Sequence, residues 1–182
     1  MNILNGMNSA LVVSASQKGA DRIAQWLGPQ TECVPVDSAA GARQLLATRR
    51  FDLLVINAPL PDEGGEELAT SGDNAAILLV PQADFDAVAA RMEPRGVMTL
   101  AKPMSALLFR QAASIMRASR AKVSRLENKL EEVRMVDRAK WVLIQTLNLT
   151  EAQSHRYIEK QAMDLRKTRR EVAENIVKTY EY

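Results

Sequence analysis

The stretch F-D-L-L-V-I-N-A-P-L-P-D-E-G-G, residues 51–65, decides the fold of this 182-residue chain. Its apolar run, residues 53–56, has the length and composition of a strand buried on both faces. Four other runs share this character: residues 10–13, 33–36, 77–80 and 97–100. Helical patterns separate the runs, and this alternation predicts a doubly wound α/β parallel sheet over residues 9–116.

The same stretch resembles the phosphorylation loop of the receiver domains of two-component signalling. Pro61 and Gly65 occupy the positions at which receivers carry a proline and a glycine. The later run A-K-P-M supplies Lys102 and Pro103 where receivers carry a lysine and a proline. The resemblance implies a flavodoxin-like (receiver-like) domain over residues 9–116, with Asn57 at the phosphoacceptor position.

Several residues that perform receiver chemistry are replaced in this chain. Asn57 has no carboxylate with which to attack a phosphoryl donor. Residues 14–16, S-A-S, stand where receivers hold magnesium with an acidic pair, and Val80 replaces a hydroxyl residue. We therefore interpret the domain as a pseudo-receiver with no metal and no cofactor.

Lys102 is then a remnant of the receiver site. Without a phosphoryl group to contact, we expect it to donate a hydrogen bond to Asn57 or to a strand-end carbonyl. Asp62 and Glu63 also lie in the loop, and they are weaker candidates for accepting a phosphoryl group.

Residues 109–140 contain no glycine or proline and predict one long helix. With Val123 at a heptad a position, the a positions also include Phe109, and the d positions include Ala112 and Leu126. We predict a coiled-coil dimerisation helix over residues 117–136. Its seam residues are Met116, Val123, Leu126, Leu130 and Val133. The alternative is a single helix that folds back on its own C-terminal bundle.

Residues 138–177 predict three short helices. Thr150 with Gln153, and Thr168 with Glu171, have capping-box spacing, which marks two helix starts. Apolar residues at helical spacing predict that the helices pack as a small three-helix bundle over residues 137–180. We expect Tyr157 and Met163, which match the apolar spacing, to lie in its core. The turn between the last two helices carries four cations in five residues.

The segments R-A-K, A-M-D-L-R and E-V-A-E of this region resemble the ANTAR domain, an RNA-binding module of bacterial transcription antiterminators. The resemblance implies a dimer that binds tandem hairpins in a nascent leader RNA and prevents terminator formation. Cations that neutralise phosphates and polar side chains that contact loop bases would make the interface. The candidate RNA-binding residues are Arg138, Lys140, Gln161, Asp164, Arg166, Lys167, Arg169 and Arg170. His155 could stack on a base, but packing is its expected role.

Composition and the absence of certain sequence patterns exclude several classes of protein. The net charge is +2, and the single cysteine, Cys33, excludes an internal disulfide and fits a reducing compartment. Because no apolar stretch is long enough to span a bilayer and the start lacks a signal-peptide pattern, we expect a cytoplasmic protein. No catalytic constellation is visible, so an enzyme is disfavoured. Two hypotheses remain: an RNA-binding antiterminator, open to control by a protein partner, or a response regulator whose helical tail binds DNA or only another protein.

Overall fold

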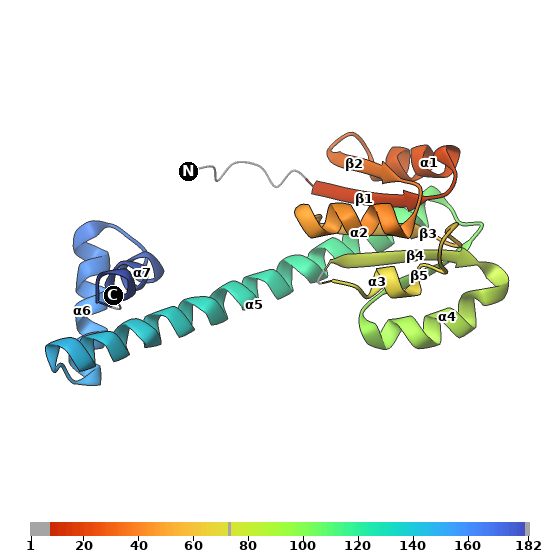
Figure 1. The fold of residues 1–182 in the computed structure, drawn as a ribbon. Coiled ribbons are helices and arrows are strands. Elements are labelled where there is room, and N and C mark those ends of the chain that lie inside the picture. The colour runs from red at the N-terminus through yellow and green to blue at the C-terminus, as the bar shows by residue number, and fades with distance from the viewer. Residues whose placement is uncertain (1–7, 73, 181–182) are drawn as a thin grey trace. The chain divides into compact units, whose positions relative to one another are not determined.

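The structure is a computed structural model that describes residues 8–72 and 74–180. The chain divides into two compact units, with the boundary between Ala121 and Lys122. The first unit is an α/β domain and the second is helical (Figure 1). In the described residues, no helix is both long enough and apolar enough to cross a membrane.

The first unit is built on five parallel strands in the order β2-β1-β3-β4-β5. The strands are β1 (Asn8–Ser14), β2 (Thr31–Val36), β3 (Leu53–Asn57), β4 (Ala75–Pro81) and β5 (Met98–Lys102). All five apolar runs are therefore confirmed as strands, and the flavodoxin-like strand order is confirmed as well. The order reverses between β1 and β3, so the carboxyl ends of these strands flank a crevice where such folds bind ligands.

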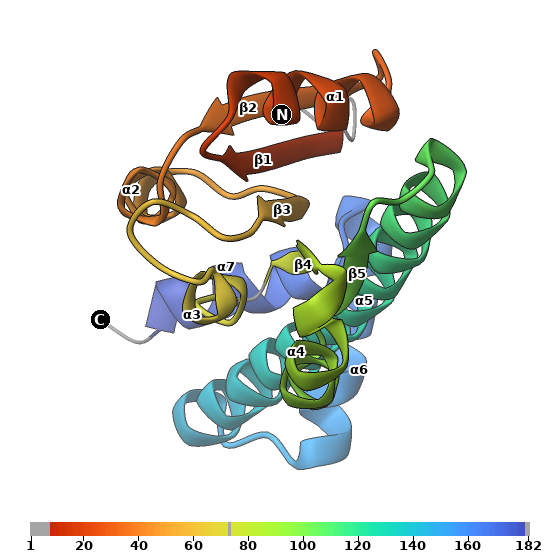
Figure 2. The same cartoon turned by 90° about the vertical axis from the view of Figure 1, so that its right-hand side faces the viewer.

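Helices cover both faces of the sheet because alternate strand residues point to opposite sides (Figure 2). On one side Leu54 and Ile56 pack with α2 (Ala39–Thr48), α3 (Glu66–Ala69) and α4 (Phe85–Met92). On the other side Leu53 and Val55 pack with α1 (Gln17–Leu27) and the start of α5 (Ala106–Leu147). Two short 3-10 helices, η1 (Gln82–Asp84) and η2 (Glu93–Arg95), flank α4.

Helix α5 is continuous for 42 residues. The expected first short helix of the C-terminal module is thus wrong as a separate element, because it is the end of α5. Nothing in the sequence stops the helix before Asn148, which adopts a left-handed conformation with φ 52°. Phe109 and Ala112, two of the heptad positions, are buried against the sheet, so the seam cannot begin there.

The second unit packs the end of α5 with α6 (Glu151–Leu165) and α7 (Arg169–Tyr180). Ala139 and Leu143 of α5, Ile158 of α6 and Ala173 of α7 are almost fully buried together. The small bundle of three helical segments is therefore confirmed. Met163 is 79% exposed and Tyr157 is 38% exposed, which contradicts the expected place of both in the core. Met163 is the clearer case. It lies next to buried Ala162, and the helix turns it away from the bundle.

Both helix starts have the expected caps. The Thr150 hydroxyl accepts the N–H of Gln153, and the Gln153 side chain accepts the N–H of Thr150. The Thr168 hydroxyl likewise accepts the N–H of Glu171, whose carboxylate accepts the N–H of Thr168 at 2.8 Å. This backbone hydrogen bond lowers the pKa of Glu171 below its usual range. The two capping boxes are confirmed, and the second fixes the end of the basic turn.

Candidate nucleic-acid interface and receiver-like site

The basic turn between α6 and α7 begins with a left-handed residue, Arg166, at φ 51°. The N–H of Arg166 donates to the carbonyl of Met163, and the N–H of Lys167 donates to that of Ala162. This is the Schellman arrangement, in which glycine usually occupies the left-handed position. An arginine there costs about 1 kcal/mol in backbone energy. The left-handed backbone conformation therefore does not favour an arginine at this position, whereas its positive charge suits an anionic ligand.

Arg169 and Arg170 are held by carboxylates of the same unit. The guanidinium of Arg170 lies 2.8 Å from Glu174 and 3.5 Å from Glu131. That of Arg169 lies 4.0 Å from both Glu132 and Glu159. These contacts join the start of α7 to α5 and α6. Part of the positive charge of the turn is therefore offset within the protein.

Arg166 and Lys167 are exposed, and neither forms an ion pair within the part of the chain that the structure describes. Their side chains can therefore approach a phosphate without first breaking an ion pair. The sequence places four cations in this turn. In the structure, two of them form ion pairs with carboxylates of the same unit, and two form none within the described residues.

The other predicted RNA-binding residues lie nearby in the chain but in different environments. Lys140 is mostly buried and lies 2.8 Å from Asp137 and 3.5 Å from Glu151, and its hydrogen bond to Asp137 raises its pKa. This pairing joins α5 to α6. Arg138 and Asp164 are exposed, and Gln161 is half-buried on α6. His155 is also exposed, 3.3 Å from Glu159.

Trp141 was not among the residues predicted from the sequence. It is 65% exposed on α5, between buried Ala139 and buried Val142. Loop bases of RNA stack on exposed aromatic rings. In the sequence, the helical spacing of Ala139, Val142 and Leu143 defines the buried face of the helix. Trp141 does not fall on that face, and this spacing could have identified it as an exposed residue.

An exposed apolar stripe runs along the part of α5 that belongs to the second unit. Its members are spaced three and four residues apart, and 42 to 57% of each is exposed: Val123, Leu126, Leu130 and Val133. These are four of the five predicted seam residues. The fifth, Met116, packs against the core of the first unit and is not part of the stripe.

At the carboxyl end of β3, Asn57 lies beside Ser14 of β1 and contacts Lys102 of β5. The Asn57 amide nitrogen donates to the Ser14 hydroxyl at 3.0 Å, and the Lys102 ammonium donates to the Asn57 amide oxygen at 2.9 Å. Lys102 also donates to the carbonyl of Ala58. Both expected partners of Lys102, Asn57 and a strand-end carbonyl, are confirmed.

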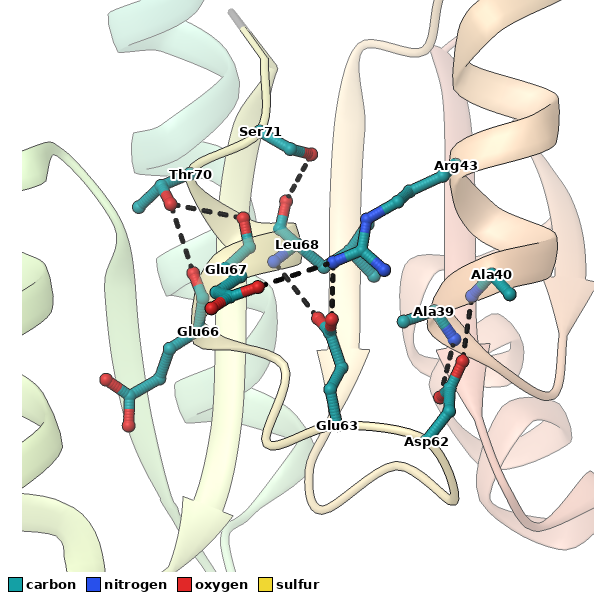
Figure 3. A network of polar contacts seen from close by, with 10 residues as sticks. All are labelled: Ala39, Ala40, Arg43, Asp62, Glu63, Glu66, Glu67, Leu68, Thr70 and Ser71. Carbon is teal, nitrogen blue, oxygen red and sulfur yellow. Dashed lines mark hydrogen bonds and ion pairs between the residues drawn. The ribbon is translucent and has the colours of Figure 1, made fainter.

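Asp62 and Glu63 of the following loop are engaged in structural contacts (Figure 3). The Asp62 carboxylate accepts the N–H groups of Ala39 and Ala40 at the start of α2, each at 2.9 Å, and these bonds lower its pKa. The Glu63 carboxylate accepts the N–H of Leu68 and pairs with Arg43. These two carboxylates thus fasten the loop to α2 and α3.

The residues at the strand ends do not fit the magnesium ion that a receiver fold implies. Magnesium binds carboxylate oxygens, whereas this site offers a hydroxyl that already donates to the Ser16 carbonyl, and an amide bound to an ammonium. No group of three or more acidic, histidine or cysteine residues able to hold a metal ion occurs among the described residues.

Comparison with known families matches residues 124–177 to the model of the ANTAR domain. This segment is an ANTAR domain. The match covers α5 from Ser124 onward, α6, the basic turn and α7 as far as Val177. Comparison with curated protein sequences gives no match.

The first unit has the receiver fold. It is similar to the signal receiver domain of an HD domain-containing protein from Pseudomonas fluorescens Pf-5, at 26% identity and a TM-score of 0.54, covering 66% of this chain and 97% of that chain. It is also similar to a CheY-like response regulator receiver domain protein from Methanospirillum hungatei JF-1, at 17% identity and a TM-score of 0.58. That match covers 64% of this chain and 98% of that chain. A third similar structure, named adenylate cyclase, from Rhodopirellula baltica, has 15% identity and a TM-score of 0.64. That match covers 69% of this chain and 98% of that chain. At such identities the likeness is one of fold.

A receiver fold followed by an ANTAR domain fits a response regulator. Both kinds of domain are regulatory rather than catalytic.

Acetyl phosphate is expected to leave the mass of the purified protein unchanged in the presence of magnesium, since Asn57 cannot form an acyl phosphate. Asn57→Asp restores the acceptor but not the acidic pair, so it should also remain unmodified. Intact-mass spectrometry measures both. A stable adduct of one phosphoryl group on the wild-type protein would contradict the pseudo-receiver interpretation.

Proposed function

We propose that the chain is a dimeric RNA-binding antitermination regulator. Its ANTAR domain binds paired hairpins in a nascent leader transcript and prevents a terminator hairpin from forming. The observation that carries the proposal is the match of residues 124–177 to the ANTAR domain, with Arg166 and Lys167 exposed at its basic turn.

The chemistry of the turn suits a phosphate backbone. Each cation that neutralises a phosphate of single-stranded RNA releases counterions and contributes about −0.7 to the slope of log affinity against log salt. Arg166 and Lys167 are the primary contacts, and Arg138 lies on the exposed side of α5. Gln161 and Asp164 on α6 supply groups for base edges, and Trp141 supplies a stacking surface.

Arg169, Arg170 and Lys140 have a second role in this proposal. Their ion pairs hold the three helical segments together and so position the turn. Exposed ion pairs contribute about 0–1 kcal/mol each, so a phosphate can compete for Arg169 and Arg170.

The exposed stripe of α5 supports dimerisation. Its spacing is that of heptad a and d positions, which pack as knobs into holes between paired helices. Half-burying eight such side chains in a dimer yields roughly 6–12 kcal/mol. Association costs about 4–15 kcal/mol. The stripe alone therefore gives a weak dimer, and two ANTAR domains on a hairpin pair would strengthen it through avidity.

In this proposal the receiver-like unit is a control surface that does not accept a phosphoryl group. A regulatory protein partner could bind it and so govern the dimer. The alternative function is a response-regulator-like protein whose tail binds DNA or only a protein. Helix α7 offers little to duplex DNA, because its first two arginines are ion-paired and Glu171 and Glu174 follow them.

Replacing the two cations of the turn that form no ion pair in the described structure, Arg166→Gly with Lys167→Ala, should weaken RNA binding at least tenfold. The salt slope should fall by about 1.4 in magnitude, since two phosphate contacts are lost. Glycine favours the left-handed position, so thermal stability should not decrease. Filter binding or fluorescence anisotropy over a salt series, with a leader RNA that crosslinks to the wild-type protein, measures the effect.

The matched control is Arg156→Gln with Lys178→Gln, which removes the same charge from parts of α6 and α7 outside the turn. It should change affinity less than threefold. An equal loss in both double variants would mean that the net charge of the unit, and not the turn, binds RNA.

Trp141→Ala should weaken RNA binding by about 1–3 kcal/mol, the usual contribution of one stacked base. Trp141→Phe should restore much of it, because a ring remains. The helical content measured by circular dichroism should be unchanged in both variants, since the side chain is exposed. Wild-type affinity in Trp141→Ala would remove this residue from the interface.

Leu126→Glu with Leu130→Glu should make the protein monomeric in sedimentation equilibrium. Each charge would be buried at the centre of the seam, opposite its copy in the partner helix. Asn128→Glu adds charge at the outward f position and should leave the dimer intact. A dimer that survives the double substitution would place the dimer interface elsewhere.

A further inference from the structure

A cavity of about 500 Å³ opens at the carboxyl ends of β3, β4 and β5, within the first unit. This volume lies in the range of small-molecule sites. Much of its wall is apolar and is formed by Ile23, Trp26, Leu79 and Met104. Such a wall is unlike a site for a fully hydrated inorganic ion, and it suits a ligand with an apolar body.

The charged residues that line the cavity are all positive. Arg22 and Lys102 contribute cations, Asn57 contributes a neutral amide, and no aspartate or glutamate is among the lining residues. In the described part of the chain, neither cation forms an ion pair. The asparagine at position 57 has a direct consequence here, because a carboxylate in its place would neutralise Lys102.

Lys102 is half-buried with neutral partners only. Its ammonium donates to the Asn57 amide oxygen and to the Ala58 carbonyl, which leaves one of its three N–H groups for a further acceptor. Burial lowers the pKa of Lys102, because no opposite charge offsets the loss of water. An anion in the cavity would supply that charge and form a charge-assisted hydrogen bond.

We propose that this cavity binds a small organic monocarboxylate, with its carboxylate on Lys102 and Arg22 and its aromatic or branched body against Trp26, Ile23 and Met104. The chain would thus bind a small carboxylic acid at the place where receivers hold a phosphoryl group. The proposal does not depend on RNA binding.

The cavity adjoins the start of α5. The Trp26 ring lies 5.5 Å from the ring of Phe109, which is fully buried in α5, and Met104 precedes the helix by two residues. A ligand that contacts Trp26 and Met104 therefore touches the residues that seat α5 on the sheet.

The test uses a matched pair of probes, phenylacetate and its neutral analogue phenylacetamide, with the full-length protein labelled with nitrogen-15. Trp26 and Trp141 are the only tryptophans, so Trp141→Phe assigns the two indole signals without altering the cavity. Phenylacetate should shift the Trp26 indole signal in a saturable way. Phenylacetamide should bind at least tenfold more weakly, since it lacks the charge.

Two variants test the charge of Lys102 in different ways. Lys102→Met removes the charge, and Asn57→Asp supplies an internal carboxylate that neutralises it. Each should weaken phenylacetate binding about tenfold and leave phenylacetamide binding unchanged. If Lys102→Met does not fold, Asn57→Asp decides. Equal binding of the two probes, the absence of a Trp26 shift, or unchanged phenylacetate affinity in Asn57→Asp would overturn the proposal.

Discussion

The unbroken backbone of α5 is the constraint on which the rest of the structure depends. One helix, with no glycine or proline from Ala106 to Leu147, contributes to both cores. Near its start, Phe109 is buried against the sheet, and near its end Leu143 is buried in the ANTAR bundle. Between these two ends, α5 carries an exposed apolar stripe at heptad spacing, Val123, Leu126, Leu130 and Val133. Helix α5 therefore contributes residues to both units, to the receiver fold at its start and to the ANTAR domain at its end.

Charge pairing distinguishes the cations of each unit. In the ANTAR domain, carboxylates of α5, α6 and α7 hold Arg169 and Arg170, while Arg166 and Lys167 have no ion pair in the described structure. In the receiver-like unit, an asparagine stands beside Lys102 and leaves an ammonium without a counter-ion. The same principle applies in both places: a cation whose charge is not offset within the protein attracts an anion from outside. On this basis we propose RNA phosphates as the ligand of one unit and a small carboxylate as the ligand of the other.

Much of the architecture could be predicted from the sequence because its signals are local. The apolar runs gave the five strands, and Thr150 and Thr168 marked the two helix starts correctly. The errors concern features that tertiary contacts decide. Met163 has core spacing but lies on the outer side of α6, and the first ANTAR helix continues α5 because no local stop signal precedes Asn148. Glu174 is an i,i+4 neighbour of Arg170 and could be paired with it from the sequence. The other carboxylates that pair with Arg169 and Arg170 are distant in the chain: Glu131, Glu132 and Glu159. No sequence pattern within the turn contains that information.

The central claim is that the ANTAR domain acts on nascent RNA. The most direct measurement is to crosslink the wild-type protein to RNA in its own cells and to sequence the RNA that is recovered. Leader transcripts that carry two neighbouring hairpins ahead of a terminator should be enriched. Recovery of RNA at the level of an uncrosslinked control would contradict it, and the exposed stripe and the receiver-like unit would then be the surfaces through which the protein acts on a protein partner.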